Sequence, residues 1–193
     1  MTTEPKLLTE AEARDLLRYD PETGHLFWRE RPAYLFEGKK RPASVLQAIW
    51  NTRYAGTKAG CMDGEGYIGV KLFDRHQLAH RLAWAIHYGV WPDQIDHINH
   101  DRTDNRLVNL RNVSVSENNR NVRLPSRNAS GVVGVGWDSR QGGWSAIITF
   151  EKRKIRLGLF ATIAEAATAR KAAERQYGFH PNHGIGAPPE PQP

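Results

Sequence analysis

Hydrophobic and polar positions in the first thirty residues predict one helix and one strand. Thr9-Glu10-Ala11-Glu12 is a capping-box pattern, which predicts a short helix with Leu16 and Leu17 on its apolar side. Residues 20–24 have the composition of a tight turn, and His25–Trp28 is typical of a strand. Residues 31–53 show no clear periodicity, so they predict no element.

A second patterned stretch begins near Tyr54. Tyr67–Leu72 follows the glycine-rich turn at residues 64–66 and predicts a strand. Apolar residues then recur at helical spacing over positions 78–86, and the helix that they predict ends at Gly89.

The next stretch is rich in polar residues and carries the candidate chemistry. Its pattern predicts a strand ending in Asp96-His97, a long loop, and a second strand at Leu110–Ser114. Ser116 is then expected to cap a helix with Asn118 in its first turn. A strand, loop, strand and helix in this order would bring Asp96, His97 and Asn118 around one point.

Three apolar stretches near the C-terminus predict a small sheet, namely Val132–Trp137, Gly143–Phe150 and Lys154–Leu159. A second capping box at residues 162–165 predicts an alanine-rich helix that runs to about Tyr177.

Composition narrows the class of protein. No apolar run approaches the roughly 18 residues that a membrane span needs, and residues 1–15 lack the basic start and apolar core of a secretory signal. Cys61 is the only cysteine in the sequence, which excludes an internal disulfide and a zinc site built on paired cysteines. We expect an intracellular, cytoplasmic protein that binds neither a membrane nor a small-molecule cofactor.

The positive charge is concentrated in one block of the sequence. Eight basic residues lie between Asn119 and Arg156, and only Asp138 and Glu151 oppose them there. The net charge of this block is therefore 8 − 2 = +6, which equals the net charge of the whole chain. A basic block beside aromatic and asparagine residues favours a polyanionic partner. A solvated surface with no such partner is the alternative reading of the same charges.

The residue types at four positions suit phosphodiester hydrolysis. The Asp96 carboxylate and the Asn118 amide oxygen are hard oxygen donors of the kind that Mg²⁺ prefers. His97 has a side chain whose ordinary pKa, about 6.5, suits a general base that deprotonates water. Asn109 is expected to position the loop or the His97 backbone through its amide.

These residues resemble the HNH endonucleases, especially the phage and intron homing branch. The matching pattern is the Asp96-His97 pair, Asn109 before Leu110, and Asn118 after Glu117, with residues 80–84 also similar. The resemblance implies a ββα-metal fold, with one divalent ion, Mg²⁺ or Mn²⁺, held by Asp96 and Asn118 and with His97 as base. Asn118 stands where many members have histidine, which leaves the choice of metal open.

Two further histidines have alternative readings. His80 begins an amphipathic helix and is interpreted as a structural histidine or as a ligand. His100 lies in the predicted loop and is interpreted as a surface residue or as a substrate contact.

The C-terminal part resembles the plant ethylene-response-factor (Apetala-type) DNA-binding domain. Gly134-Val135, residues 143–147, residues 157–160 and Ala166-Ala167 carry the resemblance, which implies a three-stranded antiparallel sheet lying in DNA and backed by one helix. The arginines of the plant domains are missing from the first two strands, so base contacts are not transferred. From charge and expected exposure, the candidate contacts to double-stranded DNA in this region and before it are Arg120, Arg123, Arg127, Trp137, Arg140, Trp144, Lys154 and Arg156. Trp137 and Trp144 have an equal claim to be core residues.

These patterns together predict an α+β protein, in which a ββα-metal nuclease module precedes a small three-stranded antiparallel sheet with one helix. The expected organisation is an N-terminal helix and strand segment at 1–53, a nuclease domain at 54–123, a linker at 124–130, a DNA-binding domain at 131–178 and a flexible tail at 179–193.

Three functions remain open from the sequence. The first is a metal-dependent DNA endonuclease of homing type, which either nicks DNA or cuts both strands. The second is a catalytically silent DNA-binding regulator built from the same modules. The third is a structural module of a phage packaging machine. The sequence leaves the target site and the oligomeric state open.

Overall fold

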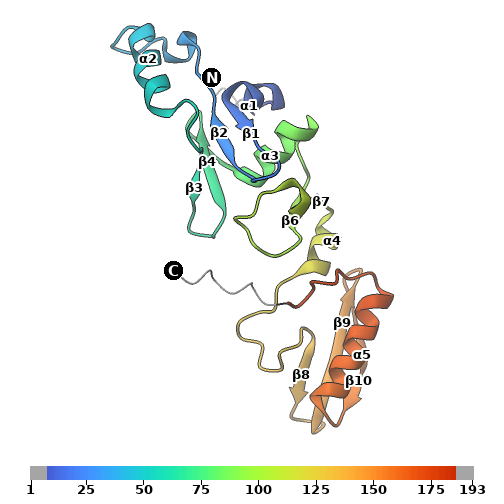
Figure 1. Cartoon of the computed structure of the whole chain (residues 1–193). Coiled ribbons are helices and arrows are strands. Elements are labelled where there is room, and N and C mark those ends of the chain that lie inside the picture. Colours follow the sequence, from blue (N-terminus) through green and yellow to red (C-terminus); the bar gives the residue numbers. More distant parts are fainter. Residues whose placement is uncertain (1–7, 186–193) are drawn as a thin grey trace, which may run out of the picture. The chain divides into compact units, whose positions relative to one another are not determined.

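The computed structural model describes residues 8–185, and the fold is α+β (Figure 1). It divides into two compact units. Within the described residues, the N-terminal unit comprises residues 8–97 and 102–112, and the C-terminal unit comprises residues 98–101 and 113–185. No helix in the described part of the chain is long and apolar enough to cross a membrane.

The N-terminal unit opens with the helix and strand that the sequence predicted. Helix α1 (Glu10–Leu16) begins at a complete capping box, in which Thr9 and Glu12 satisfy each other's backbone N–H groups. Strand β1 (Leu17–Tyr19) follows it and pairs antiparallel with β2 (Leu26–Trp28). Leu16 and Leu17 are both buried, as expected, but Leu17 belongs to β1 and not to the helix, because the chain is already extended at this residue.

The sequence failed to predict the next two elements. They are the 3-10 turn η1 (Ala33–Phe36) and helix α2 (Ala43–Tyr54). Because α2 has no buried residue, it lacks the apolar stripe on which a helix prediction depends. It is attached to the unit by polar and aromatic contacts instead.

The rest of the N-terminal unit is a small sheet, one helix and a strand pair. Strands β3 (Cys61–Met62), β4 (Ile68–Leu72) and β5 (Arg75–Leu78) form an antiparallel sheet. Helix α3 (Ala79–Tyr88) follows and ends at Gly89, whose φ of 75° is the left-handed cap that the sequence predicted. Then β6 (Ile95–His97) pairs with β7 (Leu110–Asn112), which follows the 3-10 turn η2 (Leu107–Asn109).

One apolar core joins these elements. Leu17, Leu26, Val70, Leu72 and Leu82 are among its most buried members. Ile95 of β6 and Leu110 of β7 belong to the same cluster, so the strand pair that bears Asp96 and His97 is anchored in the core.

The C-terminal unit begins with a single helical turn, α4 (Val115–Asn118), and the 3-10 turn η3 (Asn119–Asn121). The cap of α4 is Ser114, which forms a capping box with Glu117, so the prediction that Ser116 caps this helix was wrong. The reciprocal bonds between Ser114 and Glu117 satisfy two backbone donors, which explains why the helix starts two residues earlier.

The predicted three-stranded sheet is present in the C-terminal unit. Strands β8 (Val135–Asp138), β9 (Gly143–Phe150) and β10 (Arg153–Phe160) are antiparallel, with β9 in the centre. Helix α5 (Ile163–Gln176) starts at the predicted capping box and packs its small Ala166 against the sheet. Figure 1 shows α5 running along the sheet.

Residues 179–185 differ from the loose tail that composition suggested. The Phe179 N–H donates to the Glu174 carbonyl at 2.9 Å, and the Gly184 N–H donates to the Val122 carbonyl at 2.8 Å. His183 is fully buried. Composition could not show the bond to Val122, because it joins segments distant in the sequence. Residues 186–193 of the predicted tail lie outside the described part.

Candidate functional site

Strand β6 holds Asp96 and His97 in a buried position. Asp96 is 6% exposed, and its carboxylate accepts two hydrogen bonds from the Arg111 guanidinium, with Nε at 2.7 Å and Nη2 at 2.5 Å from the same Oδ2 atom. Asp96 and Arg111 are direct cross-strand partners of β6 and β7. The strand pairing therefore fixes the carboxylate, and a buried charge gains the partner that it needs.

The imidazole of His97 is held by a hydrogen bond that selects its tautomer. Its Nε2 lies 3.1 Å from Oδ1 of Asn105, which is 2% exposed. An amide oxygen only accepts, so Nε2 carries the proton and Nδ1 is the basic nitrogen. Asn105 is fixed in turn, because the Tyr19 hydroxyl donates to its main-chain carbonyl at 2.7 Å.

Asn109 stabilises the loop between β6 and β7. Its side-chain Nδ2 donates to the Asp104 carbonyl at 2.8 Å, and its backbone N–H donates to Arg106. Asn109 is 5% exposed, so these bonds are shielded from water. The bond to the Asp104 carbonyl places the side-chain amide on the loop, which is one of the two positioning roles expected for it.

An aromatic cluster packs around His97. The ring of His80 lies edge-on to it, with centroids 5.0 Å apart and planes at 90°, and Tyr67 contacts both histidines. His80 is 5% exposed, and burial lowers its pKa to about 3, with a smaller contribution from His97. His80 is therefore neutral at physiological pH. Its Nδ1 has no hydrogen-bond partner among the described residues.

Asn118 belongs to the C-terminal unit, at the last position of α4. No group of three or more His, Cys, Asp or Glu side chains within residues 8–185 is arranged to hold a metal ion. The predicted ligand pair is one carboxylate and one amide, a donor set that suits Mg²⁺, which keeps several waters when bound. His100, also in the C-terminal unit, contacts the Asn121 carbonyl at 2.8 Å and its Oδ1 at 2.9 Å.

The register of the C-terminal sheet separates the predicted DNA contacts onto two faces. Directly paired residues share a face, so Lys154 and Arg156 of β10 lie with Thr149 and Ile147 of β9. Trp137 pairs with Trp144, two positions along the strands from the pair Val135 and Ala146, which packs on α5, so the two pairs share a face. Trp144 packs against this core, whereas Trp137 is 56% exposed.

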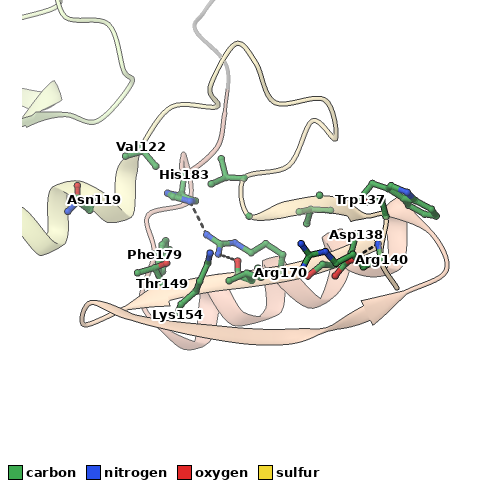
Figure 2. A pocket seen from close by; sticks show the side chains of 17 residues that line it. Asn119, Val122, Trp137, Asp138, Arg140, Thr149, Lys154, Arg170, Phe179 and His183 are labelled. Atoms are coloured by element: carbon green, nitrogen blue, oxygen red, sulfur yellow. Dashed lines mark hydrogen bonds between the residues drawn. The ribbon is translucent and has the colours of Figure 1, made fainter. Parts of the chain in front are cut away.

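A hollow of about 930 Å³ lies over the face that carries Thr149 and Lys154. In Figure 2, Trp137, Asp138 and Arg140 lie at one end of it, and Lys154 and His183 lie toward the other. The remaining predicted contacts are distributed around this unit. Arg123 and Arg127 are exposed, and Arg120 is half-buried with its guanidinium 5.0 Å from the centre of the Phe150 ring.

A buried ionic cluster contributes two residues, Arg170 and His183, to the lining of the hollow. Arg170 donates from Nε to Glu174 Oε1 at 2.9 Å and from Nη1 to the Ile147 carbonyl at 2.5 Å. Its Nη2 lies 3.2 Å from Nε2 of His183, a contact drawn in Figure 2. Burial is the main cause that lowers the pKa of His183 to about 4, so this histidine is a neutral acceptor for Arg170.

Sequence reasoning missed three residues that shape the site. They are Asn105, Arg111 and Tyr67, which contact His97 or Asp96. Arg111 carried a usable signal, because it stands opposite Asp96 once the two strands are paired. Asn105 carried none, since an asparagine in a polar loop is ordinarily a turn residue.

Comparison with known proteins adds an independent observation. Residues 77–120 match the sequence profile of a family described as HNH endonuclease, and this span contains Asp96, His97, Asn109 and Asn118. Residues 77–120 therefore correspond to an HNH endonuclease domain.

Protein 3.8 of Escherichia phage T7 is 30% identical to this chain over 86 residues, which cover 44% of this chain and 71% of the phage protein. The chain belongs to the same family as this phage protein. No solved structure matches it.

Proposed function

We propose that this protein is a metal-dependent DNA endonuclease of the homing type, with Asp96 and Asn118 as metal ligands and His97 as general base. The observation that carries the proposal is the buried setting of His97, beside Asp96 and with its tautomer fixed by Asn105. These residues fall within the span that matches the HNH endonucleases.

The chemistry follows from the state of each side chain. His97 accepts a proton from the attacking water at Nδ1, while Asn105 keeps the other nitrogen protonated. Asn109 holds the loop that carries Asn105. Arg111 keeps the Asp96 carboxylate in place. A divalent cation, when bound, stabilises negative charge that develops on the phosphate and on the leaving oxygen.

The C-terminal unit is proposed to bind double-stranded DNA in the manner of the Apetala-type domains. Its three-stranded antiparallel sheet with one helix supports this assignment. Lys154 and Arg156 are the proposed phosphate contacts of the open sheet face, and Arg140 is a further proposed contact at the other end of the hollow from Lys154. Arg120, Arg123 and Arg127 are proposed contacts before the sheet. Trp137 is a better candidate for base or sugar contact than Trp144, because Trp144 packs against the core.

Cleavage of supercoiled plasmid and phage DNA tests the proposal. Purified protein is incubated with Mg²⁺ or Mn²⁺, beside an EDTA control and the His97→Ala variant. We expect nicking that EDTA abolishes and that His97→Ala lowers by about 10²–10⁴-fold, with DNA binding unchanged. His76→Ala is the matched control, since His76 is an exposed histidine of β5.

One observation favours the catalytically silent alternative. Arg111 already supplies two hydrogen bonds to Asp96, so the carboxylate is charge-compensated without a metal. The regulator would be favoured if the protein binds plasmid and phage DNA but shows no metal-dependent cleavage of either. Equal loss of binding and cleavage in His97→Ala would remove His97 as the base.

A further inference from the structure

A segment of the N-terminal unit has an exposed, basic surface that the nuclease site does not use. It comprises residues 31–54, which include η1 and α2, and we call it the basic arm. The arm contains five basic residues and one acidic residue, Glu37. The other described residues of the N-terminal unit contain ten basic and twelve acidic side chains. The net charge of the arm is therefore positive, whereas that of the rest of this unit is negative.

Specific contacts hold the arm together, and contacts to Trp28 attach it to the rest of the unit. Asn51 of α2 accepts from the Arg31 N–H at 2.8 Å and donates to the Arg31 carbonyl at 3.1 Å. The Arg31 guanidinium lies 4.0 Å from the centre of the Trp50 ring and 5.1 Å from that of Trp28. Trp50 also packs edge-on against Trp28, with centroids 5.7 Å apart. These contacts order the inner face of α2 and orient its outer face toward solvent.

The outer face of α2 carries small or weakly apolar side chains. Val45 is 46% exposed and Ile49 is 50% exposed, and Ser44, Ala48 and Thr52 are exposed beside them. No residue of α2 is acidic. A helix face of this kind fits the major groove of DNA, where small apolar groups contact thymine methyl groups.

Three consecutive cations precede this helix. Lys39, Lys40 and Arg41 are exposed, and none of them forms an ion pair within residues 8–185. Positive charge at a helix N-terminus opposes the helix dipole and reduces stability. These charges therefore do not stabilise the helix that follows them, and an interaction with a negatively charged partner would explain their presence.

We propose that the basic arm docks on duplex DNA, with Lys39, Lys40 and Arg41 on the phosphate backbone and the outer face of α2 in the adjoining major groove. This inference rests on the proposed nuclease function and extends it to a contact surface outside the catalytic residues. The complementary charge of the arm is the reason for choosing DNA as its partner.

Salt-dependent binding of the full chain to duplex DNA, measured in EDTA to prevent cleavage, tests the proposal. The arm variant Lys39→Gln/Lys40→Gln should lower the slope of log affinity against log salt by roughly 1.8, because each phosphate contact contributes roughly 0.9. The control Lys71→Gln/Arg75→Gln changes the net charge equally on the β4–β5 hairpin. We expect its slope to match that of the wild type.

A second pair of variants tests the helix face itself. Ile49→Glu should weaken DNA binding about tenfold relative to Ile49→Gln, because the two side chains have similar size and differ in charge. Both replace a half-exposed residue, so the fold is retained.

The outcomes separate this inference from the proposed function. Wild-type protein that fails to bind duplex DNA would overturn both. DNA binding by the wild type with an unchanged slope in the arm variant, or an equal loss in the control variant, would overturn the arm alone. Loss of self-association in Ile49→Glu with unchanged DNA affinity would also overturn it, because a second copy of the chain would then cover this face.

Discussion

The candidate sites of the two units use polar and charged residues in opposite ways. In the N-terminal unit, Asp96 and His97 are buried and their side chains are fixed by Arg111 and Asn105. In the C-terminal unit, the cations of the sheet face, such as Lys154, are exposed around an open hollow. Buried and oriented groups suit catalysis, because folding has already fixed their orientation and they need not reorganise during the reaction. Exposed cations suit binding to a backbone of phosphates, which needs charge more than exact orientation.

Substitution of Asn105 tests the catalytic side of this comparison and is expected to have the largest effect. Asn105→Ala removes the acceptor of the His97 Nε2 proton but leaves the bond from Tyr19, which goes to the main chain. An unsatisfied buried donor costs about 2 kcal/mol, so we expect kcat for DNA cleavage to fall about thirtyfold. DNA affinity should be unchanged.

Asn112→Ala is the control for this experiment, since Asn112 is an exposed asparagine at the end of β7. Thermal unfolding of each variant shows how much of the chain is folded at the assay temperature. An activity loss that follows the unfolded fraction, rather than kcat of the folded protein, would contradict a positioning role for Asn105.

The sheet face provides the converse test, with a smaller effect. Lys154→Gln/Arg156→Gln should lower the salt slope of DNA binding by roughly 1.8, which is about twelvefold in affinity over a fourfold range of salt. The kcat at saturating DNA should stay near that of the wild type. The control is Lys152→Gln/Arg153→Gln, which removes the same charge at the β9–β10 turn. Equal slopes in the two variants would show that net charge, and not this face, governs binding.

The sequence predicted those elements whose signals are local. The capping boxes at Thr9 and Thr162 and the glycine cap at Gly89 were each found at their expected positions. Helix α2 was missed because its stability comes from Trp50 and Asn51 contacts rather than from a buried stripe.

The candidate site divides in the same way. Asp96 and His97 were predictable as a pair because residue type and spacing are properties of the sequence. Their partners were not, because Asn105 and His80 approach His97 only after the loop and α3 are in place. Asn118 remains a prediction from spacing.

A buried histidine in the C-terminal unit gives the last and smallest test of the comparison. His183 faces Arg170, Lys171 and Glu174, and its pKa is lowered to about 4, chiefly by burial. The unfolded chain binds a proton near pH 6.5, whereas the folded chain does not until about pH 4. Stability is therefore complete above pH 6.5 and falls as the pH decreases toward 4.

Between pH 6.5 and 5.5, this histidine alone should lower the free energy of unfolding by about 1 kcal/mol. Urea unfolding at the two pH values measures the change, and His183→Gln should remove this part of it while keeping an acceptor for Arg170. His76→Gln, at an exposed position, should leave the difference intact. If His183→Gln shows the same pH dependence as the wild type, His183 binds a proton as readily in the folded chain as in the unfolded chain. The buried cluster around Arg170 would then not hold a neutral histidine.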